Sequence, residues 1–120
     1  MPKRVLIVDD NQEVVRATSL RLRAAGYETI AAYDGDQGVD AAVQNRPDAI
    51  LLDVRMPVKD GLSALSELKR REDTREIPVV MLSASVVDQQ SALDCGARYF
   101  VRKPHDGRQL VAALNVVIPN

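Results

Sequence analysis

Apolar residues in this chain gather in five short runs, separated by longer segments of mixed polarity. The runs cover residues 4–9, 28–32, 48–53, 78–83 and 98–102. They are rich in β-branched side chains, and the first, third and fourth are almost continuously apolar. Such runs are typical of strands that are covered on both faces, as in a parallel sheet between helices. The pattern therefore predicts five buried, parallel strands.

The segments between the runs have the length and mixed polarity of helices. We expect helices over residues 12–25, 35–45, 61–72, 87–95 and 106–118. Gly26 stands just beyond the first of them, where a left-handed residue commonly ends a helix. The first and the fourth are weak predictions: the apolar stripe of the first is made of small residues, and the fourth offers only Val86, Val87, Ala92 and Leu93 as apolar residues. Weak packing there would suit a mobile element.

Five alternating β-α units predict an α/β fold. We expect a doubly wound five-stranded parallel sheet, (βα)5, with right-handed crossovers that place helices on both faces. At 120 residues the chain fits a single domain over residues 1–120, which buries about two thirds of the surface its unfolded form exposes. The sequence stops after the fifth helix, so we expect a stand-alone domain or one excised from a longer protein.

Charge and composition limit the classes of binding partner and the cellular locations that we expect for this chain. The 16 basic and 17 acidic residues leave a formal charge of −1, so no global field favours nucleic acid or an anionic membrane. The apolar runs are far shorter than the ~18 residues of a membrane span, and the N-terminus does not resemble a signal peptide. Cys95 is the single cysteine, so no internal disulfide can form, and we expect it to be semi-buried. A reducing, cytoplasmic location fits best.

Polar side chains follow four of the predicted strands at the point where each strand ends. Asp9 and Asp10 follow the first, Asp53 closes the third, Ser83 closes the fourth, and Lys103 follows the fifth. Ligands of doubly wound sheets bind outside the carboxyl ends of the strands. The sequence therefore predicts a site of three acids, one hydroxyl and one ammonium at a single edge of the sheet.

Three unpaired carboxylates at one edge of the sheet would repel one another unless a cation bound between them. Two of them about 5 Å apart repel by roughly 3 kcal/mol at an effective dielectric near 20. Mg²⁺ prefers oxygen ligands, so the acids are candidate Mg²⁺ ligands, with Lys103 as a further counter-charge. An aspartate beside a metal can also attack phosphorus and form an aspartyl phosphate. Asp53 is the natural nucleophile, because we expect it to be flanked by donors from both neighbouring strands. Lys103, the Ser83 hydroxyl and a backbone N–H near Ala84 would neutralise charge on the phosphoryl group.

Four motifs in this order resemble the receiver domain of two-component response regulators, including the single-domain chemotaxis regulator, over the whole chain. They are Val8-Asp9-Asp10, Leu52-Asp53-Val54-Arg55-Met56-Pro57 followed by Asp60-Gly61, Leu82-Ser83-Ala84, and Lys103-Pro104. The resemblance implies the flavodoxin-like strand order 2-1-3-4-5. It also implies that Asp53 accepts a phosphoryl group from a phosphohistidine on a sensor histidine kinase or a phosphotransfer protein.

The resemblance implies roles for the surrounding residues as well. Asp10, Asp53 and the backbone carbonyl of Arg55 would ligate Mg²⁺ directly, and Asp9 would act largely through water. Lys103 would contact a phosphoryl oxygen. Such a domain catalyses only its own phosphorylation and dephosphorylation, so we do not expect an enzyme acting on a separate substrate.

The family also implies a switch and a docking surface. Ser83 would move toward the phosphoryl group and Phe100 would turn inward behind it, although Phe100 also fits an ordinary core position. The peptide bond before Pro104 would be cis, against the trans bond that statistics favour. Partners would dock on the face made by the fourth helix, fifth strand and fifth helix, and an activation-dependent homodimer is compatible with this. Residues expected to line that face are Ala97, Arg98, Tyr99 and Arg102.

One departure from the family's commonest pattern is Arg55. We hypothesise that its guanidinium lies over the phosphoryl group, with Ser85 opposite, and changes access by the hydrolytic water; the alternative is a solvated arginine. Two other functions are open. A Mg²⁺-dependent phosphohydrolase would carry an acid where Arg55 stands, and a receiver-like domain that no longer takes phosphate would not need the full set of acids, hydroxyl and lysine.

Overall fold

The predicted alternation of strands and helices is present throughout the structure, a computed structural model that describes residues 2–103 and 106–118. The strands are β1 (Arg4–Val8), β2 (Glu28–Ala32), β3 (Ala49–Asp53), β4 (Val79–Ser83) and β5 (Tyr99–Arg102). The helices are α1 (Gln12–Ala24), α2 (Gly35–Asn45), α3 (Gly61–Arg70), α4 (Val86–Asp94) and α5 (Gly107–Val117). Each lies where the hydrophobic pattern placed it, to within two residues at either end.

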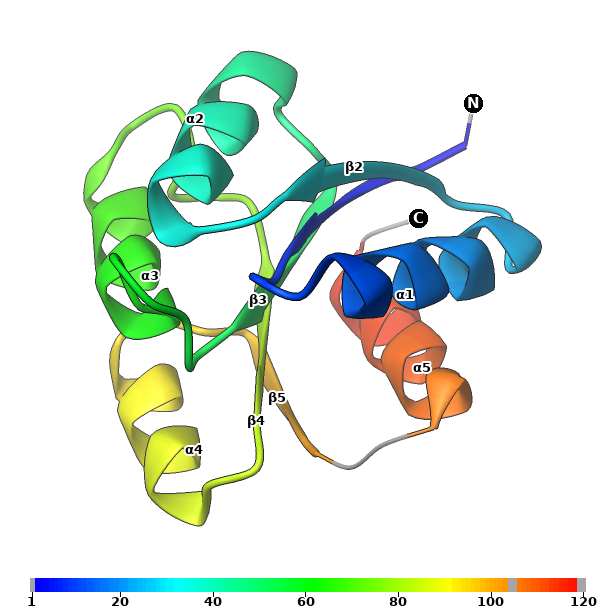
Figure 1. The fold of residues 1–120 in the computed structure, drawn as a ribbon. Coiled ribbons are helices and arrows are strands. Elements are labelled where there is room, and N and C mark those ends of the chain that lie inside the picture. Colours follow the sequence, from blue (N-terminus) through cyan, green and yellow to red (C-terminus); the bar gives the residue numbers. More distant parts are fainter. Residues whose placement is uncertain (1, 104–105, 119–120) are drawn as a thin grey trace.

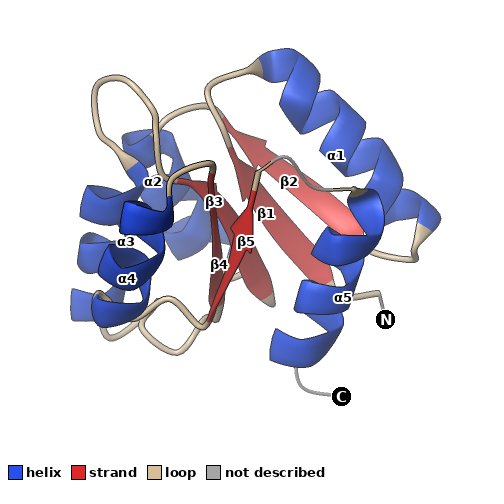
Figure 2. Cartoon of the chain, turned by 90° about the horizontal axis from the view of Figure 1, so that it is seen from below, coloured by secondary structure: helices blue, strands red, loops and turns tan. Residues whose placement is uncertain are grey.

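The five strands form one parallel sheet in the order β2-β1-β3-β4-β5. Helices α2, α3 and α4 cover one face and α1 and α5 cover the other, as Figures 1 and 2 show. Strands β3 and β4 are buried over their whole length, which explains their nearly continuous apolar sequence. The doubly wound fold and the strand order expected from the family resemblance are therefore confirmed.

Two apolar clusters hold the layers together, one on each face of the sheet. On the α2-α3-α4 side, Leu6, Ile50 and Met81 pack among helix side chains such as Leu65. On the other side, Leu51 and its neighbours pack against α1 and α5. The alternation of strand side chains between the two faces fixes the register of the sheet. It thereby fixes which residue ends each strand.

Side-chain caps start the helices close to the strand ends. Asn11 accepts hydrogen bonds from the N–H groups that begin α1, Asp34 and Asp60 cap α2 and α3, and Asp106 forms a capping box with Gln109 at α5. Helix α4 differs, because its N-cap residue Ser85 makes no side-chain capping bond. It is also one of the two helices, with α1, whose apolar pattern in the sequence was weak.

Helix α3 ends earlier than the predicted residue 72. Arg71 is already extended, with φ −92° and ψ 134°, and its guanidinium binds Asp73 through two hydrogen bonds of 3.0 and 3.1 Å. The Thr74 hydroxyl donates to the carbonyl of Leu68 at 2.7 Å, so it satisfies a carbonyl of the last turn. The charged tract over residues 69–73 contains neither Gly nor Pro, so the sequence carried no signal for the end of the helix at this point.

Two predictions of burial near the end of α4 are wrong. Cys95 is exposed, because it caps the outer end of α4, whereas we expected it to be semi-buried. Ala97, expected on the docking surface, is buried and packs in the cluster beneath α3 and α4. Gly96, at φ +106°, turns the chain between these two residues and sends Ala97 inward.

Candidate functional site

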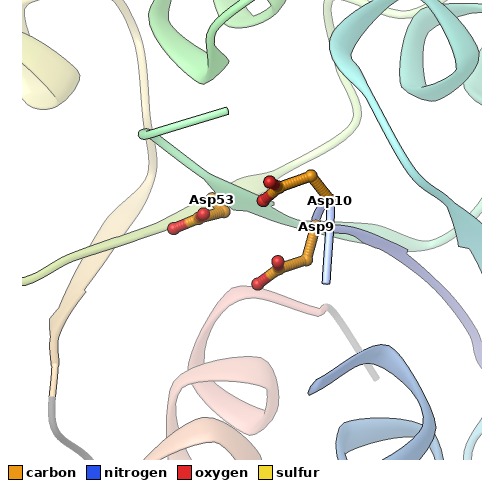
Figure 3. Close-up of side chains that lie close together, drawn as sticks. All are labelled: Asp9, Asp10 and Asp53. Carbon is orange, nitrogen blue, oxygen red and sulfur yellow. The ribbon is translucent and has the colours of Figure 1, made fainter. Parts of the chain in front are cut away.

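Five polar residues lie at the carboxyl ends of the strands, where the sequence predicted them; the three acids and Lys103 are in contact, whereas the Ser83 hydroxyl binds Asp88. Asp9 and Asp10 follow β1, Asp53 and Ser83 are the last residues of β3 and β4, and Lys103 follows β5. Figure 3 shows the three acids gathered at this edge, two from the segment after β1 and one from β3. One carboxylate oxygen from each acid lies within 4.8 Å of one oxygen from each of the other two.

Lys103 provides the positive charge inside this cluster. Its Nζ lies 2.9 Å from Asp53 Oδ1 and 3.9 Å from Asp9 Oδ2. One ammonium therefore faces three carboxylates, and two of these, Asp9 and Asp53, are 7% and 5% exposed. A hard divalent cation with oxygen ligands fits this donor set and would offset the excess negative charge.

The buried acids titrate abnormally. Burial raises the pKa of Asp53 above its ordinary value, and the negative charges of Asp9 and Asp10 add to this, while Lys103 works against it. Burial likewise raises the pKa of Asp9, opposed by a hydrogen bond from the backbone N–H of Asn11 and by Lys103. A raised pKa also means a more basic carboxylate, which suits a nucleophile.

The loop after β3 folds back closely over the acceptor position. The N–H of Gly61 donates to the carbonyl of Val54 at 2.8 Å, and the N–H of Val54 donates to Leu82 at 3.0 Å. A Cβ on Gly61 would stand 2.2 Å from the backbone oxygen of Asp53. Only glycine allows this approach, so Gly61 holds the tip of β3 against the start of α3.

Arg55 lies elsewhere than we hypothesised. Its guanidinium forms a bidentate ion pair with Asp88 of α4, with Nε 2.9 Å from Oδ2 and a terminal nitrogen 3.0 Å from Oδ1. Ser83 Oγ donates to the same Oδ2 at 2.6 Å, and the N–H of Ser85 donates to Ser83 Oγ at 3.1 Å. The Arg55 side chain is 71% exposed, as the solvated alternative expected, but it is ion-paired with Asp88 and does not lie over the acids. Ser85 is engaged with Ser83.

Sequence reasoning missed Asp88. It stands in the first turn of α4, where an acid usually marks a favourable position in the helix dipole. The one sequence signal was its spacing of four residues from Ala92, which places both on one side of the helix, and the structure shows that these two are the buried residues of α4. The adjacent pair Val86 and Val87 drew attention to the opposite, exposed side of the helix.

The remaining predicted residues have mixed outcomes. Phe100 is partly buried and packs against the core on the α2-α3-α4 side, in keeping with a core position. Tyr99, Arg98 and Arg102 are exposed. Pro104 lies outside the described residues, so its predicted cis bond stays a prediction. In the described part of the chain, no helix is long and apolar enough to cross a membrane.

Comparison with known proteins names this arrangement. The family model of the response regulator receiver domain matches residues 5–115. The chain belongs to the response regulator receiver family. The transcriptional regulatory protein PrrA of Mycobacterium tuberculosis is 39% identical over 117 residues, which cover 96% of this chain and 49% of PrrA. This receiver therefore spans about half the length of the curated relatives it matches.

Solved structures agree with this assignment. The receiver domain of the sensor histidine kinase PA1611 from Pseudomonas aeruginosa is 33% identical, covers 98% of both chains and superposes with a TM-score of 0.91. That structure has a magnesium ion coordinated in its active site cleft. The chemotaxis protein CheY4 of Vibrio cholerae is 30% identical, with a TM-score of 0.90 and coverage of 98% of this chain and 99% of CheY4. The chain is thus a receiver domain of the response regulators of two-component systems.

Proposed function

We propose that this receiver takes a phosphoryl group onto Asp53 in a Mg²⁺-dependent reaction, from a phosphohistidine on a sensor histidine kinase or a phosphotransfer protein. The observation that carries the proposal is the pairing of a buried Asp53 with Lys103 at 2.9 Å, inside a group of three acids. The magnesium in the cleft of the PA1611 receiver domain supports the same chemistry here.

The residues present suit Mg²⁺. Asp10 and Asp53 would hold it directly together with the backbone carbonyl of Arg55, and Asp9 would act largely through water. When bound, Mg²⁺ would neutralise negative charge on the phosphoryl oxygens. Lys103 can hold Asp53 in place through Oδ1, which leaves Oδ2 to face the incoming phosphorus.

The transfer itself exchanges one bond for another. An oxygen of Asp53 forms a bond to phosphorus while the bond from phosphorus to the imidazole nitrogen of the donor breaks, and that nitrogen keeps the electron pair. Lys103, the Ser83 hydroxyl and the N–H of Ala84 would donate to the three phosphoryl oxygens, where charge accumulates. Attack of water on phosphorus later breaks the bond between phosphorus and the Asp53 oxygen, which releases inorganic phosphate and restores the carboxylate.

The modified carboxylate is the chain's own, so we propose a signalling switch and not an enzyme with a separate substrate. A phosphohydrolase would need an acid where Arg55 stands, and a guanidinium stays protonated and cannot exchange that proton. A domain that had lost phosphate binding would have no use for three clustered acids facing one lysine. Both alternatives are therefore less well supported.

We further propose that phosphorylation changes the face formed by α4, β5 and α5, where a downstream protein would dock. Tyr99 is 43% exposed there and is our candidate contact, flanked by Arg98 and Arg102. Ser83 and Phe100 stand in neighbouring strands, with Phe100 paired to Met81 in the β4–β5 register. An activation-dependent homodimer through this face stays a prediction.

Incubation with MgCl₂ and acetyl phosphate, followed by intact mass spectrometry, tests the proposal. We expect the mass of one phosphoryl group to be added, and no addition in EDTA or in Asp53→Asn. Asp40→Asn, on the exposed side of α2, is the matched control and should be modified like the parent. An equal gain of mass in Asp53→Asn would refute the assignment of the acceptor. Turnover of the phosphodonor without a modified chain would favour the phosphohydrolase.

A further inference from the structure

Asp88 is a buried acid with no part in the proposed phosphoryl chemistry, yet it binds two residues of that site. Its side chain is 7% exposed. Oδ2 accepts the Ser83 hydroxyl at 2.6 Å and Arg55 Nε at 2.9 Å, and Oδ1 accepts the second arginine nitrogen at 3.0 Å. One carboxylate thus joins the end of β4, the loop after the acceptor strand and the first turn of α4.

The rest of α4 is held loosely at this end. Val86 and Val87 are 57% and 71% exposed, and the Ser85 side chain does not cap the helix. The buried residues of α4 are Asp88 and Ala92. The three hydrogen bonds of Asp88 are therefore the main specific attachment of the first turn of α4 among the described residues.

The Ser83 hydroxyl carries a single proton. While it donates that proton to Asp88, it cannot donate it to a phosphoryl oxygen on Asp53. We propose that Asp88 is a positioning residue that retains the Ser83 hydroxyl in the unmodified receiver and so opposes activation, an inference that rests on the proposed function. Arg55 is its counterpart, because its two hydrogen bonds keep the carboxylate satisfied once the hydroxyl leaves.

This exchange links the chemistry to the outer surface. When the hydroxyl turns to the phosphoryl group, the first turn of α4 loses its tie to β4 and stays attached to the loop after β3 through Arg55. The loop after β3 begins next to the acceptor Asp53. After the exchange, α4 should therefore move with this loop and no longer with β4. A shift of α4 is the expected result.

Binding of beryllofluoride with MgCl₂ measures the competition, because this complex mimics an aspartyl phosphate. We compare the parent with Asp88→Asn, which keeps the shape but offers a weaker, neutral acceptor. Because one charge-assisted hydrogen bond is removed, we expect this variant to bind beryllofluoride roughly tenfold more tightly than the parent. Binding is measured by NMR titration of the backbone N–H signals of Ser83 and Ala84. Asp94→Asn, at the other end of α4, is the matched control and should bind like the parent.

A second comparison separates retention of the hydroxyl from a general loosening of α4. In a Ser83→Ala background, Asp88→Asn should no longer tighten binding, because there is no hydroxyl to release. The Arg55 side chain is 71% exposed, so Arg55→Ala should be tolerated by the fold. Without the arginine, Asp88 should hold the Ser83 hydroxyl more tightly, so Arg55→Ala should weaken binding of beryllofluoride severalfold in the parent. In the Asp88→Asn background the same substitution should have little effect. These readings do not depend on Asp88→Asn being fully stable.

The outcomes distinguish the two proposals. If the parent does not bind beryllofluoride, the proposed function fails and this inference fails with it. If the parent binds but Asp88→Asn binds equally or more weakly, the phosphoryl site stands and the role of Asp88 is wrong. Tightening that persists without the Ser83 hydroxyl would likewise overturn it.

Discussion

Asp10→Asn should make the receiver more stable and, at the same time, unresponsive to Mg²⁺. One carboxylate oxygen from each of Asp10, Asp9 and Asp53 lies within 4.8 Å of the other two. Within the described residues, Lys103 pairs with Asp9 and Asp53, so replacing Asp10 leaves these ion pairs in place. The substitution removes a repulsive charge without orphaning a cation.

The magnitude follows from Coulomb's law. At 4.8 Å and an effective dielectric near 20, each carboxylate pair repels by about 3.5 kcal/mol. Asp10 is exposed, and solvent screening reduces such terms several-fold, so we expect a gain of about 1 kcal/mol in the free energy of unfolding. For the parent, Mg²⁺ at ten times its Kd should add about 1.4 kcal/mol, and this gain should be lost in the variant.

Urea denaturation followed by circular dichroism, in EDTA and in MgCl₂, measures both effects. Asp94→Asn removes an equal charge far from the strand ends and controls for net charge. If Asp10→Asn is less stable than the parent in EDTA, the acids do not repel as the geometry requires. If it keeps the full response to Mg²⁺, Asp10 is not a ligand.

Three further expectations concern the same region. In EDTA, the raised pKa values of Asp9 and Asp53 mean that the folded chain holds these protons more tightly than the unfolded one. The free energy of unfolding should therefore fall as pH rises above about 3.8. Urea midpoints measured against pH should fall less steeply for Asp53→Asn than for the parent, and equal slopes would contradict the pKa directions. Val58, 91% exposed at φ 69°, is strained, so Val58→Gly should raise the free energy of unfolding by about 1 kcal/mol, and a loss on denaturation would show that no strain is stored. Gly61→Ala should cost about 2–3 kcal/mol because its Cβ meets the Asp53 backbone, and an unchanged thermal midpoint would disprove that contact.

The strands and the acidic site were predictable for the same reason. Buried parallel strands require continuous apolar runs, and these runs end abruptly at Asp9, Asp53 and Ser83. Because all five strands run in one direction, their ends must share an edge, so residues distant in sequence were brought together by topology alone. No knowledge of side-chain packing was needed.

The contacts of α4 were not predictable in this way. Arg55 and Asp88 are 33 residues apart, and their meeting depends on how a weakly patterned helix is seated. Val86, Val87, Ala92 and Leu93 allow more than one buried side, so the sequence did not show that Asp88 faces inward. Cys95 was expected to be semi-buried because cysteine usually behaves as a small apolar residue, but its position at the end of α4 leaves it exposed.

The exposed thiol of Cys95 has a practical use. It is the single cysteine of the chain, and it lies at the outer end of α4, the opposite end from the turn that Asp88 secures. A maleimide dye or a nitroxide spin probe can therefore be attached there without altering the sequence. Such a probe would turn any tilt of the helix into an optical or magnetic signal, which lets the signalling step be timed in this receiver without a substitution.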